Sequence, residues 1–212
     1  DFVILHQGGF KHAVSPLGTS LTKEQALLLR RYTEEVILAF DADAAGEKAA
    51  LRGIDLLVEE GFRVRVARLP SGVDPDEVVC ASGADSMRRY LDTALSMFDF
   101  LVECARKRFN CGDPEGRISA VQFMLPTIAK APGSMRKAEY VRMLSQCFDI
   151  DEQALRSELA KAETYRVVAD TIRPKNRVKA VNGAERVVCA LVLDDPRRAE
   201  AFSCSCALED IQ

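Results

Sequence analysis

Residues 35–46 read EVILAFDADAAG, and this stretch decides the fold. The part before Ala42 is a nearly continuous apolar run, which is typical of a strand buried on both faces, as in parallel sheets. A helical pattern then runs from Ala44 to Glu60 and stops at Gly61, a residue type that commonly ends helices. A buried strand followed directly by a helix predicts an α/β domain.

The neighbouring stretches extend this α/β pattern in both directions. Residues 63–69 alternate basic and apolar side chains, which predicts a strand with one solvated face. We also expect a short helix that begins at Phe2 and is stopped by Gly8-Gly9, a short strand over 12–16 and a helix over 23–32. Short links between these elements imply right-handed crossovers, so the sequence predicts a doubly wound parallel sheet.

Helical patterns alone follow from about residue 75 onward. They cover residues 86–94, 96–109, 115–130, 135–148 and 152–162. Residues 163–183 interrupt the pattern with proline and an Asn-Gly pair, which predicts a linker, and helical periodicity resumes afterwards. We therefore expect a sheet domain at 1–80, a helical subdomain at 81–162, the linker, and the start of another helical domain at 184–212.

The composition excludes several classes of protein. The 212 residues are 48% hydrophobic, and no apolar run approaches the roughly 20 residues of a membrane helix, so we expect no membrane partner. The net charge of -3 gives no general attraction to nucleic acid. Seven cysteines without Cys-x-x-Cys spacing predict free, mostly buried thiols and a cytoplasmic location. Because the chain begins with Asp1 inside a helical pattern, we expect it to be part of a longer protein.

Two pairs of aspartates follow the ends of predicted strands. Asp41 and Asp43 come directly after the buried strand, and Asp74 and Asp76 follow the strand over 63–69. Because the carboxyl ends of parallel strands meet at one edge of a sheet, both pairs are expected to face one crevice. Carboxylate oxygens suit Mg²⁺ or Mn²⁺. Helix capping is the alternative explanation for Asp43 and Asp74, whereas capping does not explain Asp41.

A second group of residues is a candidate for contact with nucleotide or nucleic acid. Gly18 and Thr19 follow the predicted strand over 12–16, so their backbone amides could touch a nucleotide; a plain turn is the alternative. Arg63, Arg65 and Arg68 are expected to share one face of their strand, where they could meet phosphate groups. An exposed edge of the sheet would explain these arginines equally well.

Four short motifs follow one another in a fixed order: LGTSLT at 17–22, DADAAG at 41–46, LP at 69–70 and DPD at 74–76. This ordered series resembles the TOPRIM part of bacterial DnaG-type DNA primases. The resemblance continues through DPEGR at 113–117, LPTI at 125–128 and Tyr140, and it covers about residues 1–162. From residue 184 the chain is similar to the start of the helicase-binding domain of these primases.

The resemblance implies a fold and a reaction. The fold is α/β, a TOPRIM-like doubly wound parallel sheet followed by an all-α helical subdomain and a partial C-terminal helical domain. The reaction is the synthesis of short RNA primers on single-stranded DNA from ribonucleoside triphosphates, with Mg²⁺ or Mn²⁺ as cofactor. By motif, Asp41 and Asp43 are catalytic metal ligands, and Asp74, Asp76 and Asp1 are further metal ligands. A replicative helicase is the implied partner of the C-terminal part.

The chain departs from the family pattern in two ways. Alanine stands between Asp41 and Asp43 where the family has glycine, and the family's metal-binding glutamate would precede Asp1, as would its zinc-binding and template-binding domains. We therefore expect the isolated chain to be inactive in priming.

Other functions remain as alternatives. One is another TOPRIM protein, either a nuclease or a type IA topoisomerase, although no tyrosine here is placed as the nucleophile that a topoisomerase needs. A phospho-acceptor receiver domain would require a lysine after the strand over 63–69, where the sequence has Leu69-Pro70. A non-catalytic helicase-interaction module is the last alternative.

Overall fold

The computed structural model describes residues 2–16 and 21–172, which divide into two compact units. The first unit extends to Met97 and the second begins at Phe98. Over the described residues the fold is mixed α/β, with a three-stranded sheet and nine helices. α5 (Ala84–Asp92) belongs to the first unit, where it contacts the preceding helix and the sheet.

The sheet of the first unit is mixed rather than wholly parallel. β1 (Glu35–Asp41) pairs in parallel with β2 (Arg63–Leu69), and all of β1 between its end residues is buried, as predicted. β3 (Leu95–Ser96) adds to β2 in the antiparallel direction. The prediction of an entirely parallel sheet is therefore wrong for the described residues. Two residues are too few to show any periodicity in the sequence.

The strand predicted over 12–16 is absent, and these residues form a turn and an irregular segment. The Ala13 amide donates to the carbonyl of Phe10, and the Ala13 carbonyl contacts Nε2 of His6 at 3.0 Å. Local hydrogen bonds thus use the backbone groups that a sheet ladder would need. Pro16 has no amide hydrogen to contribute either.

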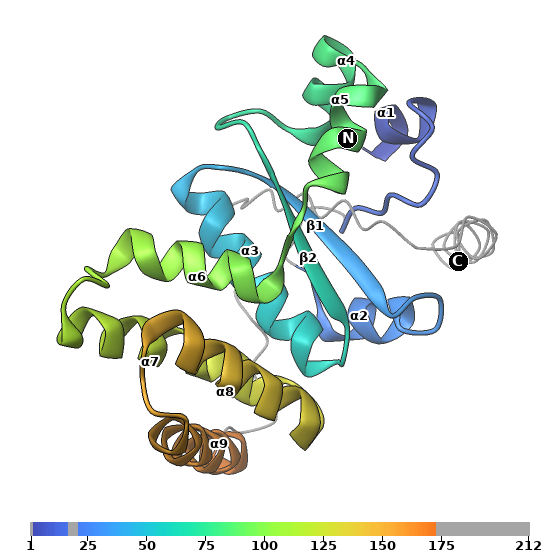
Figure 1. Ribbon diagram of the computed structural model, residues 1–212. Coiled ribbons are helices and arrows are strands. Elements are labelled where there is room, and N and C mark those ends of the chain that lie inside the picture. The colour runs from blue at the N-terminus through green and yellow to red at the C-terminus, as the bar shows by residue number, and fades with distance from the viewer. Residues whose placement is uncertain (1, 17–20, 173–212) are drawn as a thin grey trace. The chain divides into compact units, whose positions relative to one another are not determined.

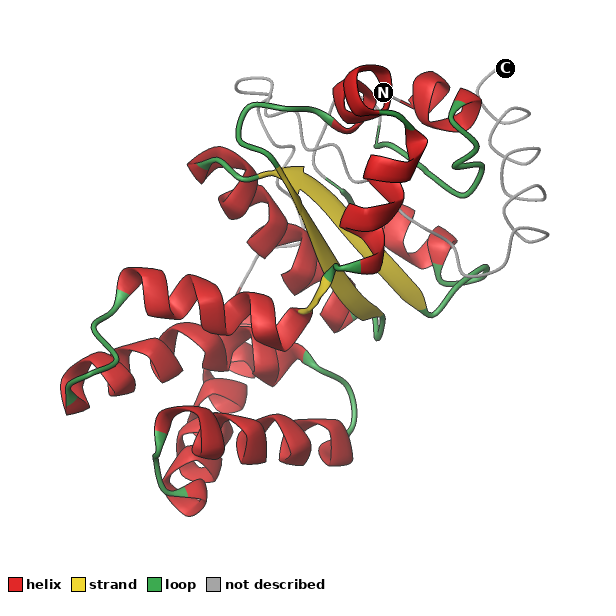
Figure 2. Cartoon of the chain, turned by 45° about the horizontal axis from the view of Figure 1, so that its top comes forward, coloured by secondary structure: helices red, strands yellow, loops and turns green. Residues whose placement is uncertain are grey.

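Helices cover both faces of the sheet (Figures 1 and 2). α3 (Ala44–Glu59) packs on β1 and β2, where Gly53 approaches Leu38. α1 (Phe2–Gln7), α4 (Pro75–Ser82) and α5 lie on the other face. α2 (Lys23–Leu29) contacts α3 and is capped by Thr22, and it ends before Tyr32, the last residue of the predicted helix. The expected two-sided helical cover is present.

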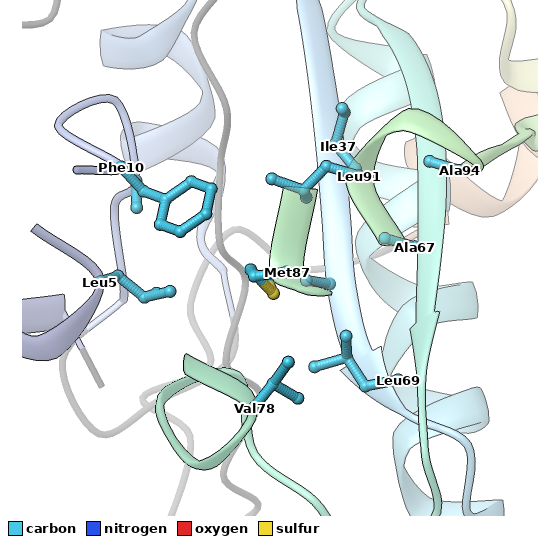
Figure 3. Packing of buried hydrophobic residues seen from close by; sticks show 11 residues of the cluster. Leu5, Phe10, Ile37, Ala67, Leu69, Val78, Met87, Leu91 and Ala94 are labelled. Atoms are coloured by element: carbon cyan, nitrogen blue, oxygen red, sulfur yellow. The ribbon is translucent and has the colours of Figure 1, made fainter. Parts of the chain in front are cut away.

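One apolar cluster joins α1, α4 and α5 to the sheet (Figure 3). Met87 of α5 lies between the side chains of α1 and its following turn and those of the strands, where Leu69 is 1% exposed. The strand residues of this cluster are Ile37, Ala39, Ala67 and Leu69, which all have odd numbers because alternate side chains of a strand share a face. This packing fixes α4 and its preceding loop at the carboxyl end of β2.

The second unit consists of helices. These are α6 (Met97–Arg108), α7 (Pro114–Lys130), α8 (Ser134–Phe148) and α9 (Glu152–Ile172). Asp151 caps α9, accepting a hydrogen bond from the Ala154 amide at 2.9 Å. α9 continues through the beginning of the segment expected to be a linker, and residues 173–212, including the expected domain start at 184, lie outside the described part.

Two simpler expectations concern membranes and thiols. None of the described helices combines the length and apolar character that crossing a membrane requires.

The four described cysteines form no disulfide with one another. Of these, Cys104 is buried, Cys80 is exposed, and Cys111 and Cys147 are partly exposed, so the prediction of mostly buried thiols is wrong for this part of the chain.

Candidate metal centre

The candidate site lies where β1 and β2 end. Asp41 is the last residue of β1 and pairs in register with Leu69, the last residue of β2. Both strands therefore deliver their following loops to one edge of the sheet, as the parallel prediction required. The loop after β1 leads through Asp43 into α3, and the loop after β2 leads through Asp74 into α4.

Asp43 is fixed by helix capping. Its Oδ1 accepts a hydrogen bond from the backbone amide of Gly46 at 2.5 Å, and the residue has the extended conformation of an N-cap. A negative charge at this place is also favoured by the positive end of the α3 dipole. Capping, the alternative explanation for Asp43, is thus present, and it sets the orientation of the carboxylate.

Asp41 lies against the same turn. A Cβ atom on Gly46 would overlap Oδ1 of Asp41, and it would lie 2.5 Å from the Asp41 backbone oxygen and 3.2 Å from Oδ1 of Asp43. Glycine at position 46 therefore permits the first turn of α3 to pack directly against the strand-end carboxylate. This close approach brings two negative side chains together.

The electrostatic surroundings disfavour the charged form of Asp41. Burial raises the pKa of its carboxyl group above the ordinary value, and the negative charges of Asp43 and Asp74 raise the pKa further. A hydrogen bond from the Gly72 backbone opposes the rise. A carboxylate held beside two like charges is an arrangement that a bound cation would relieve. The role of Gly72 was missed from sequence, where only its place in the loop before Asp74 could have suggested it.

The second acidic pair begins α4. The Asp74 amide donates to Oε2 of Glu77 at 3.2 Å, and Pro75 occupies the first turn, so the predicted helix start is confirmed. Asp76 lies in that first turn with its Oδ1 buried. Within residues 2–16 and 21–172, no three acidic, histidine or cysteine side chains are grouped to hold one ion. The residues brought together are thus Asp41 and Asp43, with the charge of Asp74 acting on Asp41.

The remaining predicted site residues have different outcomes. Asp1, Gly18 and Thr19 lie outside the described residues. Arg63 is exposed and forms a 3.7 Å ion pair with Glu35 of the neighbouring strand.

The other two arginines do not extend a basic face from Arg63. Arg65 donates from Nε and Nη2 to the Ala94 carbonyl and from Nη2 to the Asp92 carbonyl. Arg68 lies on the opposite face of β2, since side chains alternate along a strand, so the expected common face of three arginines is wrong.

Comparison with known proteins assigns the two units to described families. Residues 1–79 match the family described as Toprim-like, and residues 98–153 match the family described as the DnaB-helicase binding domain of primase. The first unit is therefore a Toprim-like α/β domain. The helicase-binding match falls on helices of the second unit, whereas the sequence placed the helicase contact at 184–212.

Similar proteins identify the family more closely. The DNA primase of Clostridium acetobutylicum is 38% identical over 155 residues, which cover 73% of this chain and 26% of that protein. The DNA primase of Halalkalibacterium halodurans is 31% identical over 216 residues, which cover 94% and 36%. The chain is homologous to bacterial DnaG-type DNA primases. It spans about a quarter to a third of the length of these curated relatives.

Solved structures support the same assignment. The DnaG catalytic core has a TM-score of 0.64 at 30% identity, with 73% of this chain and 51% of that chain covered. A DNA primase domain from Pseudomonas aeruginosa has a TM-score of 0.69 at 28% identity, with coverages of 76% and 51%. A DnaG catalytic domain described as bound to single-stranded DNA has a TM-score of 0.66 at 29% identity, covering 72% of this chain and 50% of that one.

The close approach at Gly46 predicts an unusual effect of alanine. Gly46→Ala should destabilise the chain by about 1–3 kcal/mol, because the new methyl group has no space beside the backbone of Asp41. Gly53→Ala in the same helix is the matched control. Its Cβ would meet only the flexible end of Leu38 at 3.3 Å, and alanine improves helix propensity by up to about 1 kcal/mol. Urea unfolding measures both; equal effects would contradict the prediction.

The raised pKa of Asp41 predicts a pH-dependent gain from its neutral analogue. The folded-state pKa lies above the unfolded one, so ionisation of Asp41 opposes folding as the pH rises through the folded pKa. Asp41→Asn should therefore raise the melting temperature near neutral pH without divalent metal. The gain should disappear in acid, at pH values below the ordinary pKa of an aspartate carboxyl, because both states are then protonated.

The control for this measurement is Asp85→Asn. The Asp85 side chain is 92% exposed and pairs with Arg88 at 2.8 Å, so its removal should give no gain at neutral pH. A melting temperature that Asp41→Asn leaves unchanged, or lowers, near neutral pH would refute the electrostatic account of this site.

Proposed function

We propose that this chain carries the metal-binding part and a helicase-binding part of a bacterial DNA primase. Such an enzyme is a DNA-directed RNA polymerase that synthesises short RNA primers on single-stranded DNA from ribonucleoside triphosphates. The observation that carries the proposal is the pair Asp41 and Asp43 at the carboxyl end of β1, within the Toprim-like match. Complete priming belongs to the longer relatives, so we expect this chain alone not to prime.

The donor chemistry of the site fits Mg²⁺ or Mn²⁺. Asp41 and Asp43 would hold the ion, and both supply the oxygen atoms that these cations prefer. Asp74 lies near enough to raise the pKa of Asp41 and is a further candidate ligand. Asp76 and Asp1 are ligand candidates from the family resemblance. When bound, the metal supplies charge stabilisation for the triphosphate and for the oxygen atoms that attack and leave.

The chain itself orients these groups. The Gly46 amide fixes Oδ1 of Asp43, and the Gly72 backbone donates to Asp41. The positive end of α3 points its backbone amides toward the same edge, which favours anionic groups such as phosphate. The parallel pairing of β1 with β2 keeps the two acidic loops at that edge. Together these features orient the carboxylates before a ligand binds.

The partners follow from the same family. Single-stranded DNA and ribonucleoside triphosphates are the proposed substrates, supported by the homologous catalytic domain described as bound to single-stranded DNA. A replicative helicase is the proposed protein partner, contacted through residues 98–153. The proposed location is the bacterial cytoplasm. A topoisomerase or nuclease is less well supported, because the relatives are DNA primases and a primase-specific family matches the second unit.

Manganese binding tests the site directly. Mn²⁺ added to the whole chain should broaden the amide signals of residues near Asp41, Asp43 and Asp74, because a paramagnetic ion relaxes nearby nuclei. The double variant Asp41→Ala, Asp43→Ala should lose this broadening, whereas Asp85→Asn should keep it. Uniform weak broadening in the unaltered chain, with no centre at these residues, would contradict the proposed metal site.

Primer synthesis tests the function. In a chimera, this chain replaces the matching part of the Clostridium acetobutylicum DNA primase. The chimera should synthesise primers. Asp41→Asn in the chimera should reduce the rate of primer synthesis by at least about 100-fold, as expected for losing charge stabilisation in a transition state. A chimera that melts cooperatively and binds Mn²⁺ but makes no primers would refute the primase assignment. Primers made by the isolated chain would refute the expectation that it is inactive.

A further inference from the structure

The segment between α5 and α6 is held to the sheet by very short secondary structure. After α5 ends, Thr93 caps the helix and the chain forms β3. β3 pairs with β2 through two residues only, Ser96 opposite Arg65 and Leu95 opposite Val66. A ladder of this length contributes few hydrogen bonds, so another interaction must contribute to holding the segment in place.

The Arg65 side chain provides that interaction. Its Nε and Nη2 donate to the Ala94 carbonyl at 3.2 and 3.0 Å, and Nη2 also donates to the Asp92 carbonyl at 3.0 Å. Carbonyls at the end of a helix have no partners within the helix, and a cation there also matches the helix dipole. Hydrogen bonds from a charged donor are stronger than neutral ones. Arg65 thus holds the segment through both its backbone and its side chain.

Arg63 shows that this is not a general property of arginines on β2. It lies on the same face two residues earlier, but its side chain is 61% exposed and its ion pair with Glu35 is 3.7 Å long. Exposed ion pairs of this kind contribute little to stability. The two arginines therefore have the same residue type and strand face but different surroundings, which makes Arg63 a matched control.

We infer that Arg65 is a clamp that holds residues 92–96 on the sheet, and that this segment opens locally when the clamp is lost. The segment joins the region matched by the Toprim-like family to the helices matched by the helicase-binding family. Arg65 and residues 92–96 all lie in the first unit, and the clamp does not require the proposed priming activity.

Amide hydrogen exchange of the whole chain tests the clamp. In Arg65→Gln, exchange at Thr93, Ala94 and the β3 residues should accelerate by about tenfold or more, as expected for losing hydrogen bonds from a charged group. Amide hydrogen exchange in β1 and α3 should change by less than about twofold, because the loss of a local interaction does not affect distant sites. Arg63→Gln should leave all of these amides unchanged.

A second substitution separates fork geometry from charge. Arg65→Lys keeps the positive charge but cannot donate to two carbonyls from a planar fork, so its exchange rates should lie between those of the original chain and Arg65→Gln. This milder variant also keeps the test informative if Arg65→Gln prevents folding. Rates in Arg65→Lys equal to those of the original chain would show that charge alone holds the segment and would overturn the role given to the planar fork.

Two outcomes would overturn the inference. Equal acceleration throughout the first unit would make Arg65 a contributor to global stability rather than a local clamp. Unchanged exchange at residues 92–96, together with weaker binding of a single-stranded oligonucleotide and a salt slope reduced by about one, would make Arg65 a phosphate contact instead.

Discussion

The parallel pairing of β1 with β2 is the constraint on which the rest of the structure depends. Because the two strands end in register, at Asp41 and Leu69, the loops that follow them begin at one edge of the sheet. An antiparallel pair would send these loops to opposite edges and separate Asp43 from Asp74. The buried apolar residues of β1 stabilise this pairing. Helices cover both faces of the sheet, so these side chains are shielded from water on either side.

The arrangement at that edge brings negative charges together at a cost in stability. Burial and the charges of two neighbours raise the pKa of Asp41, so folding disfavours the ionised form of this carboxyl group. A purely structural role would favour an asparagine or another neutral residue here. Retaining a carboxylate in such surroundings is the pattern expected of a site that a cation occupies.

Strong local signals in the sequence predicted most of the first unit and the positions of its acidic residues. The apolar run of β1, the alternation in β2 and the capping residue Asp74 each specify structure within a few neighbouring residues. The errors arise where the structure depends on particular hydrogen-bond partners that residue type and periodicity do not reveal. β3 exists because β2 offers it a partner, and the segment over 12–16 fails to pair because its backbone bonds to Phe10 and His6. The role of Arg65 likewise depends on carbonyls far along the chain.

The helical unit contains a second copy of the local device found at the candidate site. Asp113 caps α7 by accepting from the Gly116 amide at 2.6 Å, just as Asp43 caps α3 through Gly46. A Cβ on Gly116 would overlap the backbone oxygen of Asn110, so this glycine is required by close packing of a loop.

At Gly46 the crowding group is instead the strand-end carboxylate, Asp41. An aspartate cap with glycine three residues later therefore defines only a tight helix start. The proposed metal binding depends on the additional carboxylate that a buried parallel strand brings to the same turn.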